Sequence, residues 1–229
     1  MRSRGIWLSV GLLVAAVAVL LALGLRDDGD AEPALAATVQ GTEDVTAELA
    51  GLAQSGNLIG DADAPVTIVE YGDLACPACR LAAETTVPDI LERFVRTGRA
   101  SLAFRPIAFI SPSSDRGALA AEAAAEQDAM WSLIGLLYRN QGDEGSDWLT
   151  VELLEAAAVD LGLDLAVWRR DYRSDAIRRR AAAQEAAAKR DQVRATPTFV
   201  VSGPAGTRTI EGVVSADEIQ EAIEAVDPS

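Results

Sequence analysis

The sequence predicts an α/β fold, also describable as α+β, in which a block of helices interrupts a small sheet. Three observations lead to this prediction. Two apolar runs rich in β-branched residues flank a first helical stretch, and further strand-like runs occur only near the C-terminus. Between these groups, residues 114–190 have an almost continuously helical pattern. An uncharged apolar segment precedes everything else.

That apolar segment, residues 6–25, has the length and flanking charges of a transmembrane signal-anchor helix. A helix needs about 20 apolar residues to cross the hydrocarbon core of a membrane. Two arginines precede the segment and three aspartates follow it. The positive-inside rule therefore leaves residues 1–5 in the cytoplasm and places the remaining chain outside the cell membrane. The alternative is a secreted protein, cleaved from its signal peptide near Ala36.

The composition argues against several classes of function. The 229 residues include 35 acidic and 20 basic side chains, a formal net charge of −15, and no histidine. Such an acidic protein is a poor partner for nucleic acid, because phosphate binding depends on clustered Lys and Arg. The absence of histidine removes Ser-His-Asp and Cys-His catalysis, together with the commonest zinc ligand.

The folded domain is expected at residues 58–229. Residues 26–57 are rich in Asp, Glu, Ala, Thr and Gly, and we expect an acidic tether there. One short helix is predicted within the tether, because Val45, Leu49 and Leu52 would share one helical face.

The domain should begin with a strand, a helix and a second strand. Residues 65–72 are dense in β-branched side chains and bounded by Pro and Gly, which is typical of a buried strand. A helix is predicted from residue 76 to about 97, kinked or divided at Pro88. Residues 100–107 should form a strand parallel to the first.

Helices then dominate before the chain returns to strand. The predicted helices of this block are 118–138, 149–161, 164–172 and 174–190. A strand at 197–202 follows, with a turn and a partner strand after it. Ser215 should cap the final helix.

The only two cysteines, Cys76 and Cys79, lie where the first strand gives way to a helix. A structural zinc site needs four ligands, usually Cys or His, which this chain cannot supply. An inert structural disulfide remains an alternative, although a two-residue loop constrains the unfolded chain very little. The pair is therefore best explained as a redox site.

Within this pair, Cys76 is predicted to be the attacking residue. Pro77 suits the first helical position, where its missing N–H costs nothing. The Cys76 sulfur would then face unpaired backbone N–H groups and the positive end of the helix dipole, and both favour the thiolate. Cys79 lies one turn later, close enough to form a disulfide with Cys76, and should be the more buried, resolving cysteine.

The C-P-A-C motif at residues 76–79 resembles the C-P-x-C motif of DsbA-like thiol-disulfide oxidoreductases in the thioredoxin superfamily. Three further features carry the resemblance over nearly the whole predicted domain. They are the strand V-T-I-V-E-Y just upstream, the helical block, and Thr196-Pro197 heading the strand P-T-F-V-V-S. The resemblance implies a thioredoxin fold with an inserted helical domain at about 114–180.

The resemblance also implies roles for other residues. Pro197 should have a cis peptide bond and pack beside the Cys76–Cys79 disulfide, while the backbone of Thr196 pairs with an extended substrate. Glu70 occupies the position of a buried acid that relays a proton to or from the resolving cysteine, and burial should raise its pKa. From the residues alone, an ordinary turn proline and a solvated glutamate remain alternatives.

The dipeptide between the cysteines sets the expected strength of the oxidant. The strongest oxidases of the family carry Pro-His there, whereas this chain has Pro77 and Ala78. An imidazole near the nucleophile helps to stabilise its thiolate, and a methyl group does not. We expect the pKa of Cys76 to lie below the free value of about 8.5, in a less extreme oxidant.

The predicted function is that of an extracytoplasmic enzyme that introduces disulfides into exported proteins. The resemblance implies reduced or unfolded exported proteins as substrates, a membrane quinone-linked reoxidant and a monomeric state. No metal or other cofactor is expected, because the Cys76–Cys79 disulfide itself carries two electrons. Two alternatives stay open: a disulfide reductase or isomerase, and a non-catalytic binding or chaperone module with the same fold.

Overall fold

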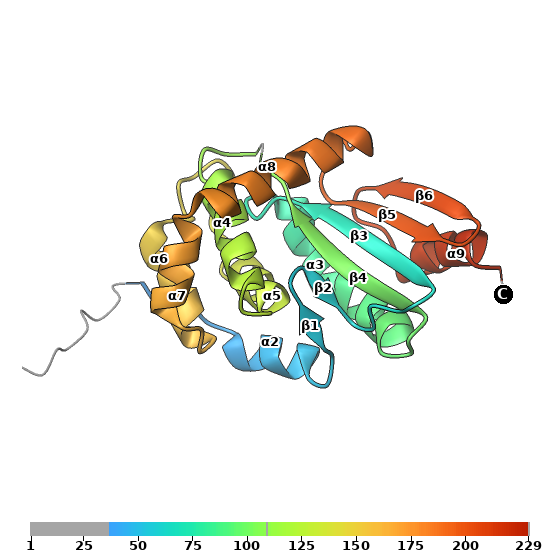
Figure 1. Cartoon of the computed structure of the whole chain (residues 1–229), viewed down its shortest axis with the longest axis horizontal. Coiled ribbons are helices and arrows are strands. Elements are labelled where there is room, and N and C mark those ends of the chain that lie inside the picture. Colours follow the sequence, from blue (N-terminus) through green and yellow to red (C-terminus); the bar gives the residue numbers. More distant parts are fainter. Residues whose placement is uncertain (1–36, 109, 229) are drawn as a thin grey trace, which may run out of the picture. The chain divides into compact units, whose positions relative to one another are not determined.

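A six-stranded sheet organises the part of the chain that the computed structural model describes, residues 37–108 and 110–228 (Figure 1). The strand order is β1-β2-β4-β3-β5-β6. At its centre, β3 (Val66–Gly72) and β4 (Ala100–Pro106) run parallel, with Val66 opposite Ala100. The predicted parallel pair is therefore confirmed.

Antiparallel strands extend the sheet on both sides. β5 (Thr198–Gly203) pairs with β3, and β6 (Gly206–Glu211) pairs with β5. On the other side, the short hairpin of β1 (Gln54–Ser55) and β2 (Leu58–Ile59) pairs with β4. The sequence did not predict this hairpin, because two-residue strands are too short for a pattern of alternation.

Helices cover both faces of the sheet, which explains why β3 is apolar along most of its length. On one face, Ile68 belongs to the main hydrophobic core. On the other, Tyr71 and Val69 pack with Ala187 of α8 (Asp175–Arg190), which lies across this face in Figure 1.

The helix that follows β3 is α3 (Pro77–Ile90), and it continues into the π-helical turn η1 (Leu91–Val95). Pro88 lies inside α3. The helix is not divided at Pro88 itself, because α3 continues to Ile90, and the change to η1 comes after it, where Arg96 N–H donates to the Leu91 carbonyl at 2.8 Å. In this π-turn the hydrogen-bond repeat changes from four residues to five.

The helical block consists of α4 (Ser114–Ala125), α5 (Met130–Arg139), α6 (Val151–Asp160) and α7 (Leu165–Tyr172), followed by α8. The single helix predicted at 118–138 is wrong, because it is divided between α4 and α5. Asp128 has a positive φ of 53° there. Its carboxylate accepts a hydrogen bond of 2.8 Å from the N–H of Gly56. This partner is distant in the sequence, so the helical pattern could not reveal the break.

The last helix is α9 (Ala216–Val226). Ser215 caps it as predicted and forms a capping box with Glu218, in which each residue's side chain accepts from the other's backbone N–H. Ile219 and Ile223 bury the inner face of α9 in the main core.

Part of the predicted tether is packed onto the domain instead of being loose. The predicted short helix is present as α2 (Thr42–Leu49), in which Val45 is 1% and Leu49 9% exposed. Arg96 donates to the carbonyls of Glu48 and Ala50 at 2.6 and 2.7 Å. For residues 37–57 the expectation of a tether is therefore wrong, because the apolar face of α2 packs against the main hydrophobic core.

The predicted cytoplasmic N-terminus, the anchor at 6–25 and the start of the tether lie outside the described residues. Across 37–108 and 110–228, no helix combines the length and the apolar character that a membrane span requires.

Candidate active site

The candidate site lies where β3 ends and α3 begins. Cys76 is the N-cap of α3, with extended backbone angles, and Pro77 occupies the first helical turn. The buried carboxylate of Asp73 shapes the connecting loop, because it accepts from the N–H groups of Ala75 at 2.8 Å and Ile110 at 3.0 Å. The predicted strand-to-helix junction at the cysteines is therefore present.

Both cysteines are free thiols in this structure, which is the reduced form of the pair. Cys76 keeps 5% of its surface exposed, whereas Cys79 is completely buried. The disulfide between them stays a prediction, since it belongs to the oxidised form.

The environment of Cys76 favours its thiolate. The pKa of Cys76 is lowered from 9.0 to about 6, chiefly by a hydrogen bond from the thiol of Cys79. Burial opposes this shift, and the backbone N–H groups of Ala78 and Cys79 support it. The direction agrees with the expectation from the sequence. The leading cause differs from the expected one, because it is the hydrogen bond from Cys79 and not the helix terminus.

Cys79 is shifted in the opposite direction. Burial raises its pKa well above the ordinary value, and the hydrogen bond to Cys76, the charge of Cys76 and the charge of Glu70 add to this effect. Near neutral pH the pair therefore exists as a Cys76 thiolate beside a Cys79 thiol. This division matches an attacking and a resolving cysteine.

Thr196 and Pro197 approach the pair from the start of β5. Their peptide bond is cis, as the family resemblance implied. The Sγ atom of Cys76 lies 3.4 Å from the carbonyl oxygen of Thr196. Residues that are distant in the sequence are therefore brought together at the site, where Cys76, Thr196 and Pro197 are all buried.

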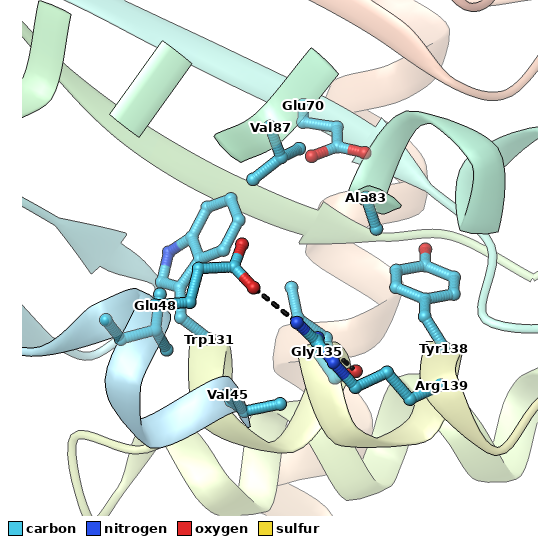
Figure 2. A pocket seen from close by; sticks show the side chains of 11 residues that line it. Val45, Glu48, Glu70, Ala83, Val87, Trp131, Gly135, Tyr138 and Arg139 are labelled. Carbon is cyan, nitrogen blue, oxygen red and sulfur yellow. Dashed lines mark hydrogen bonds and ion pairs between the residues drawn. The ribbon is translucent and has the colours of Figure 1, made fainter. Parts of the chain in front are cut away.

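Glu70 lies on β3 beneath the cysteines and is 1% exposed. Among the described residues, its Oε1 atom has no hydrogen-bond partner. Burial raises its pKa from 4.5 to about 8, so the carboxyl group is largely protonated at neutral pH. The alternative of a solvated strand-end glutamate is wrong. Figure 2 shows Glu70 at the border of a small cavity beneath the site.

Two residues that no sequence pattern indicated hold the loop that carries Cys76. The side-chain amide of Gln141 donates to the carbonyls of Leu74 at 2.8 Å and Cys76 at 3.1 Å. The hydroxyl of Tyr138 lies 3.4 Å from the carbonyl of Asp73. Both residues come from the helical block, and no local pattern marks them, because their function depends on a contact across the fold.

The fold and the cysteine pair define a protein of the thioredoxin class, and comparison with known proteins agrees. A family model described as thioredoxin matches residues 53–225. The chain therefore belongs to the thioredoxin superfamily, within its DsbA-like group. The inserted helical block is part of that fold, so the predicted thioredoxin fold with a helical insertion is confirmed.

Proteins similar to this chain include disulfide bond formation proteins of two Bacillus species. The probable disulfide bond formation protein D of Bacillus cereus is 32% identical over 149 residues, which cover 63% of this chain and 69% of the relative. Disulfide bond formation protein D of Bacillus subtilis is 28% identical over 174 residues, covering 73% and 75%. The crystal structure of oxidised BdbD from Bacillus subtilis superposes with a TM-score of 0.66 and 27% identity, over 75% of this chain and 96% of that one.

Proposed function

We propose that this protein introduces disulfides into exported proteins through Cys76 and Cys79. Membership of the family makes the chain a thiol-disulfide oxidoreductase. The names of its relatives support the forming direction. The observation that carries the proposal is the opposite shift of the two thiol pKa values, which prepares one sulfur to leave or attack and the other to hold a proton.

The reaction begins with the oxidised pair. A substrate thiolate attacks the Sγ atom of Cys76, and the Cys76–Cys79 bond breaks. Cys79 leaves as a thiolate and takes a proton from the carboxyl group of Glu70, whose raised pKa suits a general acid. A second substrate thiolate then attacks the substrate sulfur of the mixed disulfide and releases the Cys76 thiolate. The substrate loses two electrons, and the cysteine pair gains them.

The low pKa of Cys76 supports the oxidising direction. A pair whose reduced form is stabilised is a stronger oxidant. The value of about 6 lies between those of thioredoxin, about 7, and DsbA, about 3.5. We therefore propose a reduction potential between about −270 and −120 mV, the values of those two proteins. A reductase would require a potential near the lower limit of this interval. An isomerase would require a potential near its middle.

Substrate would bind over the edge of the site formed by Thr196 and Pro197. The backbone of Thr196 would pair with an extended segment of substrate, which places the substrate sulfur near Cys76. Pro77 is exposed and Ala78 half-buried beside it. Neither side chain carries a charge that could stabilise the thiolate of Cys76. We therefore propose a weaker oxidant than one with Pro-His between its cysteines.

The proposed setting is the outer face of the cell membrane. The segment 6–25 would anchor the protein with its N-terminus in the cytoplasm. A membrane quinone-linked partner would reoxidise the Cys76–Cys79 pair, so no bound cofactor is required. The protein would act on its reduced substrates as a monomer.

The test combines a redox equilibrium with an oxidation assay. The fraction of oxidised Cys76–Cys79 in glutathione buffers gives the potential, and a reduced, unfolded secreted protein reports disulfide formation. With oxidised glutathione as the electron acceptor, we expect Cys76→Ser to abolish this formation and Cys79→Ser to accumulate a mixed disulfide at Cys76. An unimpaired Cys76→Ser protein would instead indicate a binding or chaperone module, and a potential at or below that of thioredoxin would indicate a reductase.

A further inference from the structure

A network of three polar side chains, here called the tyrosine network, takes no part in the proposed reaction. The hydroxyl of Tyr71 on β3 donates a hydrogen bond of 2.5 Å to the carboxylate of Asp191. Arg105 of β4 donates to the same hydroxyl at 2.6 Å, and its guanidinium lies 3.6 Å from the carboxylate. Asp191 is the C-cap of α8. The network therefore joins the centre of the sheet to the C-terminal end of α8.

The position of Tyr71 in the sheet brings the network close to the substrate edge of the site. In the sheet register Tyr71 lies opposite Arg105 of β4 on one side and Thr198 of β5 on the other. Thr198 directly follows Pro197. Side chains alternate along a strand, so Tyr71 and Glu70 point to opposite faces. The network thus lies on the face covered by α8, behind the redox site.

A tight turn connects the network with the segment that leads to Pro197. Gln192 has a positive φ of 57°. The N–H of Val193 donates to the carbonyl of Ala188 at 2.9 Å, so α8 ends in a left-handed turn directly after Asp191. Figure 1 shows α8 lying across the sheet and leading into β5. The course of the chain beyond α8 therefore depends on how this turn is held.

The far end of this segment is held by the sheet. The hydroxyl of Thr198 donates to the carbonyl of Ala195 at 2.8 Å. Thr196 lies between this contact and the turn, and its carbonyl oxygen is 3.4 Å from the Sγ atom of Cys76. Residues 191–198 are thus anchored at both ends, and the tyrosine network supplies the side-chain hydrogen bond at the first end.

The hydrogen bond from Tyr71 to Asp191 is the strongest element of the network. Arg105 and Asp191 are 31% and 34% exposed, and ion pairs at such a surface contribute little. Tyr71 is completely buried, and a buried donor that loses its acceptor is costly. Burial and the hydrogen bond to Asp191 raise the pKa of Tyr71, so the hydroxyl stays protonated and remains a donor.

We propose that the tyrosine network is a clamp that positions Thr196 for pairing with an extended substrate. Tyr71 and Asp191 are then positioning residues, which act on the substrate through residues 191–198. This inference rests on the proposed role of Thr196 in substrate binding. The clamp should matter for polypeptide substrates and not for small thiols, which have no backbone to pair.

The test compares two reductants of the oxidised full-length protein in detergent. One is a reduced, unstructured peptide with two cysteines, and the other is dithiothreitol. Acid quenching and alkylation follow the loss of the Cys76–Cys79 disulfide at several reductant concentrations. The peptide series gives a half-saturating concentration and a maximal rate, whereas dithiothreitol reports the reactivity of the disulfide alone.

We expect Tyr71→Phe, which keeps the ring and removes the hydroxyl, to weaken peptide recognition. The half-saturating peptide concentration should rise about three- to tenfold, which corresponds to the contribution of one hydrogen bond. The maximal rate and the rate with dithiothreitol should stay the same. An unchanged half-saturating concentration, or an equal loss of rate with dithiothreitol, overturns the proposal.

Tyr172→Phe is the matched control. It removes one hydroxyl from a half-buried tyrosine of the helical block, which stacks on Trp168. Peptide recognition should be unaffected in this variant. A change as large as that in Tyr71→Phe would mean that any lost hydroxyl has this effect, which contradicts the clamp.

Variants of Asp191 separate the hydrogen bond from the charge. Asp191→Asn keeps an oxygen that can accept from Tyr71 and should leave recognition nearly unchanged, because the exposed ion pair contributes little. Asp191→Ala removes the acceptor and should match Tyr71→Phe. Both changes remove the same hydrogen bond, so the double variant should be no worse than either single one. Additive losses would show that the two side chains act separately and would overturn the clamp.

A second measurement does not depend on catalysis. In the reduced protein, amide hydrogen exchange at Val193 reports opening of the turn after α8, since this N–H is bonded to Ala188. Tyr71→Phe should accelerate this exchange about three- to tenfold, and Tyr172→Phe should not. Exchange at the unmodified rate in Tyr71→Phe would overturn the proposal.

Failure of the proposed function would give a different result. If the unmodified protein does not oxidise the peptide, or if Cys76→Ser oxidises it equally well, the redox role is wrong. Exchange at Val193 would still respond to Tyr71→Phe in that case. If the unmodified protein oxidises the peptide and Tyr71→Phe recognises it equally well, only the clamp is wrong.

Discussion

At Glu70, burial determines how the stability of the protein depends on pH. The folded state raises the pKa of this carboxyl group from 4.5 to about 8 by desolvation. Its proton is therefore bound more tightly in the folded than in the unfolded chain. The stabilising contribution is complete below pH 4.5 and is lost as the pH rises through about 8.

We therefore predict that Glu70→Gln removes a pH-dependent loss of stability. Between pH 4.5 and 8, the free energy of unfolding of the unmodified protein should fall relative to that of the variant. The slope can approach about 1.4 kcal/mol per pH unit. Urea unfolding of the oxidised forms measures this difference, because the cysteines do not titrate when they are joined. A constant difference across this range would contradict the desolvation of Glu70.

Ala78 is the residue at which oxidising strength can be changed. In Ala78→His, a protonated imidazole beside Cys76 should lower the pKa of its thiol by about one unit or more. The reduction potential should rise by about 30 mV for each unit. Thiolate absorbance against pH and the glutathione equilibrium measure the two quantities. Ala78→Gln, which adds a polar side chain without charge, is the control and should change neither appreciably.

At the scale of elements, α2 is part of the folded domain. Its apolar face packs on α5, and polar contacts hold both of its ends, including the reciprocal hydrogen bonds of 2.9 Å between the backbone of Gln40 and the side chain of Asn140. The packing of α2 also closes the cavity at Glu70. A shortened chain that begins at Leu58 would expose this part of the core.

A core substitution in α2 tests whether the helix contributes to stability. Leu49→Ala should lower the free energy of unfolding by about 2–3 kcal/mol, since a buried leucine loses its contacts and leaves a cavity. The exposed Thr46→Ala in the same helix should change it by less than about 0.5 kcal/mol. Equal stability of the two variants would mean that residues 42–49 behave as a tether in solution.

At the scale of the whole molecule, the redox state and the stability of the fold are linked. The Cys76 thiolate is stabilised only in the folded, reduced protein, where its pKa falls from 9.0 to about 6. This contribution is complete above pH 9 and is lost as the pH falls through about 6. The two-residue loop of the disulfide offers little compensating constraint on the unfolded chain.

The reduced protein should therefore be more stable than the oxidised protein at pH 8, and the difference should shrink as the pH approaches 5. Thermal unfolding of both forms over this interval measures the effect. Cys76→Ser, which cannot form the thiolate, should lose the part of this pH dependence that Cys76 contributes and keep the part that Glu70 contributes. A more stable oxidised form would contradict the oxidising direction proposed for the enzyme.

Local features of the sequence were sufficient to propose a redox centre and to predict most of the secondary structure. The spacing of Cys76 and Cys79, Pro77 at the first helical position and the apolar strands on each side are properties of short segments. The N-cap of α9 at Ser215 is equally local. Thr196 and Pro197 were found because the family resemblance connected them with the cysteines.

Only the tertiary structure decided the features that depend on contacts between distant segments. It divided α4 from α5 through the contact between Asp128 and Gly56, and it packed α2 on a domain expected to begin later. It also enclosed Glu70 in an apolar environment with a cavity beside it. Burial and hydrogen-bond partners arise when separate segments meet, so a pattern along the chain can indicate a candidate pair of cysteines but not the surroundings that set their pKa values.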